Sequence, residues 1–137
     1  MCGPFNPQLF MKQFPLLLLL LGGALFAHAQ PTYKSIEQTK YRHGKTLEYI
    51  SQSRYDIEIA FHLREGYILL TNKDLGFVNK FTNIIPTEQP NSWRAYSKGT
   101  KLVLLFSITK TSDGTLSIKM DDDTFVYVMK VCQAILR

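Results

Sequence analysis

The stretch YDIEIAFHLREGYILLT, residues 55–71, decides the fold of this chain. Apolar and polar residues alternate from Tyr55 to Leu63, so every second side chain of an extended strand points to the same face. One face then packs in a core and the other is solvated, as in an antiparallel sheet. Glu65 and Gly66 supply a turn with glycine where a positive φ is wanted, and residues 67–71 return as the partner strand.

A second hairpin follows from residues 101–120. Residues 101–109 are apolar on both faces, residues 115–120 alternate, and Ser112, Asp113 and Gly114 form a tight turn between them. Weaker strands are expected at residues 46–52, 76–84 and 93–97, with a long loop at 86–92. Residues 30–45 show no clear pattern, and both an edge strand and a short helix remain open there.

The last segment changes its periodicity. Apolar residues recur at helical spacing along one stripe, made of Phe125, Val128, Met129, Cys132, Ile135 and Leu136. Asp122 or Asp123 can cap the first turn of such a helix. The pattern predicts a C-terminal helix, although Val126, Tyr127, Val128 and Val131 also suit a strand.

Together these elements predict a mainly β domain, at the border of the α+β class. We expect an antiparallel sheet of six or seven strands, twisted or forming a partly closed barrel, with one C-terminal helix packed on it. No βαβ alternation is present that would favour a parallel design.

The first 29 residues read as a signal peptide. Lys12 precedes an apolar run from Phe14 to Phe26, and Ala27-His28-Ala29 offers a cleavage site of the small-x-small type. The apolar run is shorter than the roughly 20 residues that a transmembrane helix needs. Met11 is a better start than Met1, because the first ten residues add nothing that a signal peptide requires. We expect residues 30–137 to form a single exported domain that is secreted, periplasmic or at the cell surface, with no transmembrane anchor in the mature chain.

Charge and cysteine content limit the partners and the chemistry. The mature chain keeps 15 of the 16 Lys and Arg and all 11 acids, a mild and scattered excess of +4 that does not indicate nucleic acid. Cleavage removes Cys2, so Cys132 is expected to be the only mature cysteine, unable to form an intrachain disulfide and buried as a small apolar side chain.

No motif specifies a reaction, so the sequence favours a protein that is not an enzyme. Catalytic nucleophile signatures, phosphate-binding loops and metal-ligand spacings are missing, and no cofactor or metal is expected. The acidic run 121–123 is better explained as a cap than as a calcium site. An alternative is a small hydrolase that uses His62 with Asp56 or Glu58 as acid and base.

Trp93, Arg94 and Tyr96 are the candidate ligand-binding residues. An exposed tryptophan with a neighbouring arginine and tyrosine can stack on a sugar ring or anchor a protein partner. The competing interpretation is a tryptophan that starts a strand and closes one end of the sheet.

We therefore expect an exported, non-enzymatic binding or interaction module for a small apolar ligand, a glycan or a protein partner. The seven tyrosines of the mature chain could line a cavity. Such a cavity would lie on the inward strand face, with Ile57, Ile59, Phe61, Leu69, Leu104 and Phe106 as lining candidates. A structural component of the cell envelope is a further alternative.

Overall fold

The computed structural model describes residues 31–135, so the predicted signal peptide lies outside the described residues. These residues are all-β and form one open antiparallel sheet without a helix. The sheet has eleven strands: β1 Thr32–Ser35, β2 Gln38–Arg42, β3 Glu48–Ser53, β4 Ile57–His62, β5 Tyr67–Asn72, β6 Phe77–Pro86, β7 Ser92–Ser97, β8 Leu102–Lys110, β9 Leu116–Asp121, β10 Phe125–Lys130 and β11 Gln133–Ile135.

Both predicted hairpins are confirmed. β4 pairs with β5 and β8 with β9, each antiparallel. Gly66 (φ 84°) and Gly114 (φ 88°) adopt the positive φ that their turns require. In the second turn Asp113 accepts hydrogen bonds from the hydroxyl of Thr111 and from the hydroxyl and backbone N–H of Thr115. These bonds, that of Thr111 foremost, hold the pKa of Asp113 well below its usual range.

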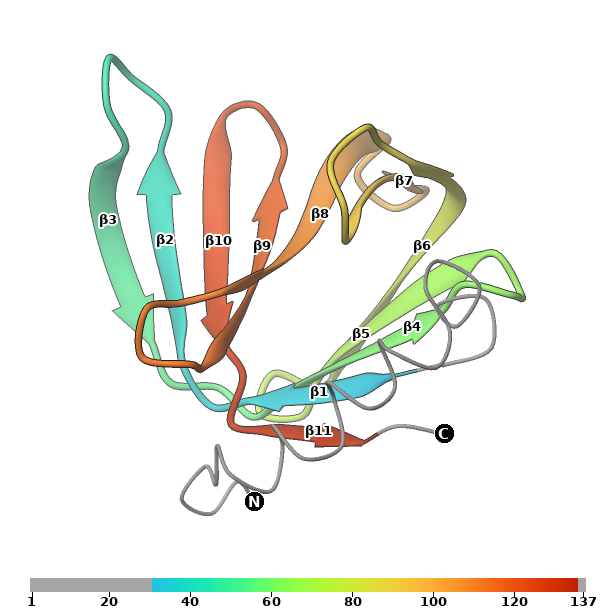
Figure 1. Ribbon diagram of the computed structural model, residues 1–137, viewed down its shortest axis with the longest axis horizontal. Helices are drawn as coiled ribbons and strands as arrows, with labels where there is room; N and C mark the ends of the chain where they lie inside the picture. The colour runs from blue at the N-terminus through green and yellow to red at the C-terminus, as the bar shows by residue number, and fades with distance from the viewer. Residues whose placement is uncertain (1–30, 136–137) are drawn as a thin grey trace.

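The strand order is β11-β1-β4-β5-β6-β7-β8-β9-β10-β2-β3, so most neighbours are also consecutive in the chain. Figure 1 shows how this sheet curls. β3, β2, β10 and β9 stand as one wing, β5, β4, β1 and β11 form the other, and β6, β7 and β8 connect them.

Residues 32–42 bring the two wings together. β1 and β2 are separated only by Ile36 and Glu37, and they pair with β11 and β10 in one continuous register, from Thr32 opposite Ile135 to Arg42 opposite Phe125. On its other side the same segment pairs with β4 through β1 and with β3 through β2. Residues 32–42 therefore pair with strands of both wings and connect the wings through one continuous, bent segment.

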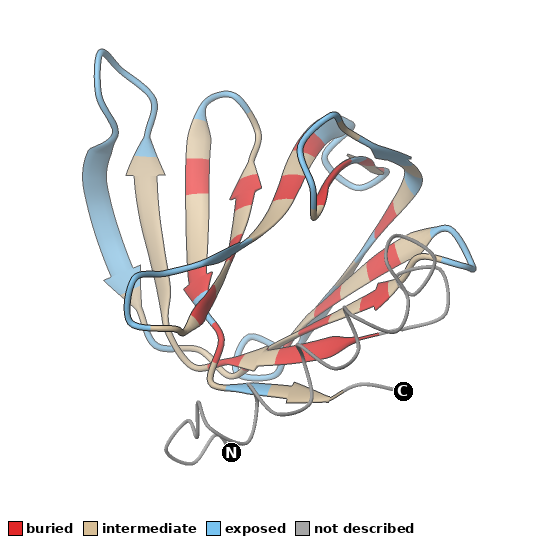
Figure 2. Ribbon diagram, in the orientation of Figure 1, coloured by how far each residue is buried: buried red, intermediate tan, exposed pale blue. Residues whose placement is uncertain are grey.

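The core lies on the inner face of the curled sheet. Phe61 contacts the rings of Trp93 and Phe106, with ring centroids 5.5 and 6.4 Å apart, and Phe81 packs on Phe106 at 4.8 Å. Figure 2 shows buried residues recurring along the strands, because inward and outward side chains alternate.

The predicted C-terminal helix is wrong, since residues 125–135 form β10 and β11. β10 pairs with β9 on one side and with β2 on the other, which satisfies its backbone groups without a helix. Val126 and Met129 are both buried although they lie on opposite faces of β10. Burial on both faces of β10 explains the helix-like spacing of its apolar residues, and pairing on both sides makes it a strand.

The expected number of strands, six or seven, is too low. All seven segments expected to be strands are present, as β3 to β9. The four additional strands are β1, β2, β10 and β11. They come from the undecided N-terminal segment and from the segment assigned to a helix, and each of these segments bends into two strands.

Candidate binding cavity

The three candidate residues Trp93, Arg94 and Tyr96 all lie on β7 but do not converge. Trp93 is only 8 % exposed and packs in the core, on the inner face. Arg94 and Tyr96 occupy the alternate positions of β7 and point to the outer face, where Arg94 is exposed. Their binding role stays a prediction, and the strand geometry offers no single surface on which all three side chains meet.

A cavity of about 310 Å³ opens instead on the inner face of the sheet, beside the packed core. Its walls come from both wings, because the sheet curls back on itself. The lining residues are Gln38, Tyr55, Leu70, Asn72, Leu75, Phe77, Asn79, Phe81, Ser97, Thr100, Leu102, Leu104, Met120, Asp122 and Tyr127. Apolar and aromatic side chains predominate, and short polar side chains are interspersed among them.

Strand alternation positions the lining residues. Leu70 and Asn72 on β5, and Phe77, Asn79 and Phe81 on β6, are alternate residues of a hairpin that point to the same face. Leu102 and Leu104 on β8 continue this pattern around the curl. Met120 on β9 pairs with Tyr127 on β10 and completes the opposite wall.

Two polar wall residues hold the turns at the mouth of the cavity. The side-chain oxygen of Asn72 accepts a hydrogen bond of 2.9 Å from the backbone N–H of Leu75, within the β5–β6 turn. The hydroxyl of Ser97 accepts one of 3.4 Å from the backbone N–H of Thr100, within the β7–β8 turn. These bonds fix the turns from which Leu75 and Leu102 project into the cavity wall.

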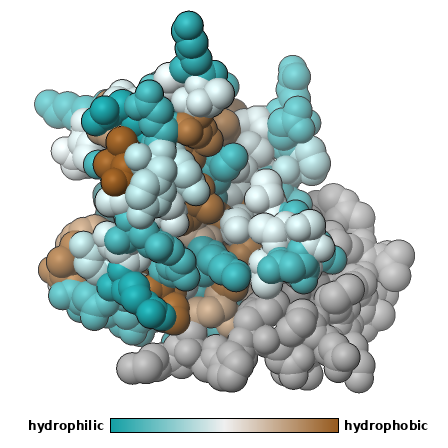
Figure 3. Space-filling view, turned by 90° about the vertical axis from the view of Figure 1, so that its left-hand side faces the viewer, coloured by the Kyte–Doolittle hydropathy of each residue, from teal (hydrophilic) through white to brown (hydrophobic). Residues whose placement is uncertain are grey.

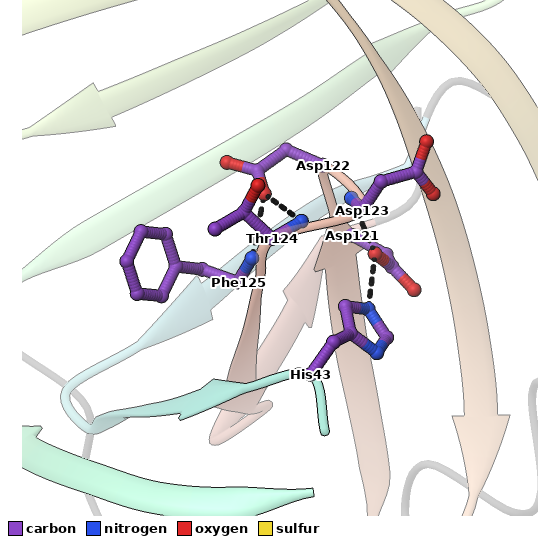
Figure 4. Close-up of polar contacts among 6 residues, drawn as sticks. All are labelled: His43, Asp121, Asp122, Asp123, Thr124 and Phe125. Carbon is purple, nitrogen blue, oxygen red and sulfur yellow. Dashed lines mark hydrogen bonds and ion pairs between the residues drawn. The ribbon is translucent and has the colours of Figure 1, made fainter. Parts of the chain in front are cut away.

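Among the described residues that line the cavity, Asp122 is the one acid. Its Oδ1 atom accepts hydrogen bonds from the backbone N–H groups of Thr124 (2.9 Å) and Phe125 (2.7 Å), as Figure 4 shows. Burial and, second, the charge of Asp122 raise the pKa of Tyr127. The remaining lining residues are uncharged at neutral pH, so the cavity suits a mainly apolar ligand with a few polar groups.

The acidic run 121–123 closes the β9–β10 hairpin and does not cap a helix, which corrects the sequence-based expectation. Asp121 accepts hydrogen bonds from the backbone N–H of Asp123 (2.9 Å) and from Nε2 of His43 (2.8 Å), which lies in the β2–β3 turn (Figure 4). The backbone N–H of His43 also donates to the carbonyl of Thr124 at 2.9 Å. These contacts connect the β2–β3 turn with the β9–β10 turn.

The residues of the hydrolase hypothesis lie on the outer face. Glu58 and His62 line a second cavity, of about 450 Å³, together with Arg64, and Asp56 is not part of its wall. Glu58 forms an ion pair with Lys73 at 2.5 Å, and the ring of His62 stacks on Tyr67 with centroids 4.7 Å apart. Four residues along a strand separate Glu58 from His62 by roughly 13 Å. This spacing does not favour an acid–base pair.

Other expectations concern metal binding and cysteine. Within residues 31–135, no group of three potential metal-ligating side chains comes together, and no helix is long and apolar enough to cross a bilayer. Cys132 is half-buried and disulfide-bonded in this structure, whereas the expected free thiol concerns the chain after removal of Cys2 and stays a prediction. The backbone N–H of Cys132 donates to the carbonyl of Lys34 at the bend between β10 and β11.

Sequence reasoning identified the inner face but misplaced the cavity on it. Of the proposed lining residues only Leu104 contributes to the wall. Ile57, Ile59, Phe61 and Phe106 belong to the packed core, and Leu69 points to the outer face and lines the second cavity. Among the tyrosines, Tyr55 and Tyr127 line the inner cavity, whereas Tyr33 is buried in the core.

Comparison with known proteins adds no assignment, because no protein-family model, curated protein or solved structure matches this chain.

Proposed function

We propose that this chain is an exported, non-enzymatic binding module that holds one small, mainly apolar molecule in the inner cavity. The cavity itself is the observation that carries the proposal. At about 310 Å³ it lies at the lower end of the range typical of small-molecule sites, and apolar side chains dominate its wall. Small closed antiparallel barrels hold one small ligand among their inward-facing side chains, and the inner face of this open, curled sheet offers a comparable wall.

The polar groups of the wall define how such a ligand is oriented. Asn79 on β6 and Gln38 on β2 present carboxamides to the cavity, and each carboxamide can both donate and accept hydrogen bonds. Leu104, Met120 and Phe81 supply the apolar surface between them. A ligand with an apolar body and one or two hydrogen-bonding groups matches this distribution better than a glycan, whose many hydroxyls would need more polar partners.

The export step rests on the sequence features of residues 11–29. The predicted signal peptide would deliver the domain outside the cytoplasm, where a small binding module can capture or carry an apolar compound. The hydrolase that uses His62 with Asp56 or Glu58, and a structural role in the envelope, remain as alternatives. A His62→Ala variant that retained full hydrolytic activity would exclude the hydrolase.

Blocking the cavity provides the direct test. In Asn79→Trp an indole enters the cavity from β6, whereas Lys80→Trp places the same side chain on the outer face one residue later. Binding of a polarity-sensitive fluorescent probe is expected to weaken at least about tenfold in Asn79→Trp and to remain unchanged in Lys80→Trp. Equal binding by both variants would refute the proposed site.

A further inference from the structure

One edge of the sheet is formed by β3, which pairs only with β2 among the described strands. The other side of β3 presents a row of backbone N–H and C=O groups on which no described strand lies. Five of its six residues are exposed, and Ser53 is half-buried. Figure 1 places β3 at the outer end of its wing, and Figure 3 views that side of the molecule, where hydrophobic patches stand among hydrophilic ones. The edge is therefore accessible to another strand.

Most of the features that protect an edge strand are missing from β3. Such strands are usually short or carry proline or lysine. β3 has neither proline nor lysine, and it has six residues against three in β11 at the other end of the strand order. Tyr49 is 62 % exposed, and Leu47 and Ile50 beside it are also exposed. The ring of Tyr49 packs edge to face on Tyr41, with centroids 6.3 Å apart. An edge with these properties favours pairing with another strand.

A register shift divides β3 into two regular halves. The shift falls at Ile50, which has no residue of β2 opposite it. Before the shift Tyr49 lies opposite Tyr41, and after it Gln52 lies opposite Thr39. Thr39 and Tyr41 are alternate residues of β2, so their side chains point to the same face. Tyr49 and Gln52 therefore share that face, although they are three residues apart.

The two end residues of β3 share the other face for the same reason. Glu48 lies opposite Arg42, and Ser53 lies opposite Gln38, which lines the inner cavity. The order of faces is therefore the same whether β3 is followed from Glu48 or from Ser53. A strand with this symmetry can pair antiparallel with an identical strand and keep every side chain on its own face.

We propose that β3 pairs antiparallel with β3 of a second copy of this chain, about a two-fold axis at residues 50–51. Tyr49 then lies opposite Gln52 of the second copy, and Glu48 lies opposite its Ser53. In each pair both side chains are on one face, as directly opposite residues of an antiparallel pair are. The contact uses the same surface of both copies, and backbone hydrogen bonds continue the sheet from one copy into the other.

Charge complementarity favours a second copy as the partner. Glu48 is the one charged residue of β3, and Arg54 follows the strand directly. Neither forms an ion pair within the described residues. Two-fold pairing brings Glu48 of each copy beside Arg54 of the other, at both ends of the contact. It also keeps the two Glu48 side chains at opposite ends, so no like charges lie directly opposite each other.

Sedimentation velocity tests the pairing. The full chain is expressed, its soluble form is purified, and we expect a dimer whose fraction rises with protein concentration. Ile50→Lys places two like charges beside the two-fold axis and should weaken dimerisation at least about tenfold. Val78→Lys is the matched control, because Val78 is 62 % exposed but lies on β6, which pairs with β5 and β7. It should dimerise as the wild type does.

A charge exchange tests the antiparallel arrangement. Glu48→Arg and Arg54→Glu each place like charges together at both ends of the contact, so each alone should weaken the dimer. The double variant Glu48→Arg/Arg54→Glu restores opposite charges and should restore dimerisation. None of the described residues of the cavity wall belongs to β3, so all of these variants should retain the fluorescent probe if they are folded.

Hydrogen exchange provides a second readout. The amides of residues 48–53 should exchange more slowly at high protein concentration, and Ile50→Lys should remove this dependence while the amides of β5 stay protected. A wild-type chain that remains monomeric at all concentrations overturns the proposal, including one whose β3 pairs only with a different protein. Equal weakening by Val78→Lys and Ile50→Lys, or a double charge variant that stays monomeric, overturns it as well.

Discussion

Phe81 and Phe106 pack edge to face with their ring centroids 4.8 Å apart, and they mark the boundary between the filled and the open parts of the inner face. Phe106 is fully buried among Phe61, Trp93 and neighbouring core residues, whereas Phe81 also forms part of the cavity wall. One side of this pair is close-packed, and the other side is the cavity in which we place the ligand.

Phe106→Ala tests the packed side of this boundary. Removing a fully buried phenylalanine should lower the free energy of unfolding by about 3–5 kcal/mol, as measured by chemical denaturation. Phe77→Ala is the control, because Phe77 is partly exposed at the mouth and should cost less than about 1 kcal/mol. Similar losses in both variants would contradict the assignment of the core.

The buried phenol of Tyr33 predicts a loss of stability at alkaline pH. Burial raises the pKa of Tyr33 above its ordinary value of 10.0, so the folded chain retains a proton that the unfolded chain releases. The contribution is fully present below pH 10 and decreases as the pH rises above that value. Tyr33→Phe should therefore move the midpoint of alkaline unfolding to higher pH. The same substitution at the exposed Tyr49 should have no effect.

Asp122 is expected to stabilise the β9–β10 turn through its acceptor oxygen and to raise the pKa of Tyr127 through its charge. Asp122→Ala removes the acceptor of two backbone N–H groups and should lower the free energy of unfolding by about 1 kcal/mol. Asp122→Asn keeps an acceptor oxygen but not the charge, so stability should change little while the pKa of Tyr127 falls toward its usual value. Tyrosinate absorbance, compared with Tyr127→Phe, measures that shift. An unchanged Tyr127 titration in Asp122→Asn would refute the electrostatic contact.

The predicted cleavage after Ala29 has a chemical consequence for Cys132. The processed chain would begin at Gln30 or its cyclised form and would have lost Cys2, the only other cysteine of the sequence. A single thiol that reacts with a maleimide after unfolding is then expected, together with the denatured mass of residues 30–137. A longer chain with no reactive thiol would show that the leader and the disulfide are retained.

The hairpins were predictable from sequence because their information is local. Alternation at Tyr55–Leu63 and glycine at positions 66 and 114 determine strands and turns within a few residues of one another. The Asp-rich turn was also visible, but its role depended on whether a helix or a strand followed it. That choice depended on the pairing of Val126 and Val128 with β2 and β9, which no local pattern encodes.

The cavity could not be predicted for a related reason. Its wall combines Gln38 with Leu70, Leu102 and Met120, which come together only when residues 32–42 bend at Ile36 and Glu37 and pair with strands of both wings. Period-two alternation shows that these residues face inward. It does not show which inward residues meet a partner and which border empty space, so Ile59 and Leu104 look equivalent in the sequence.

The central claim is that the inner cavity holds a small molecule, and native mass spectrometry of the chain recovered from its exported fraction tests it most directly. We expect a native mass that exceeds the chain by a few hundred daltons. The excess should be lost on denaturation and absent from Asn79→Trp, but retained in Lys80→Trp. A bare chain mass for the wild type, or an adduct that survives in Asn79→Trp, would contradict the claim.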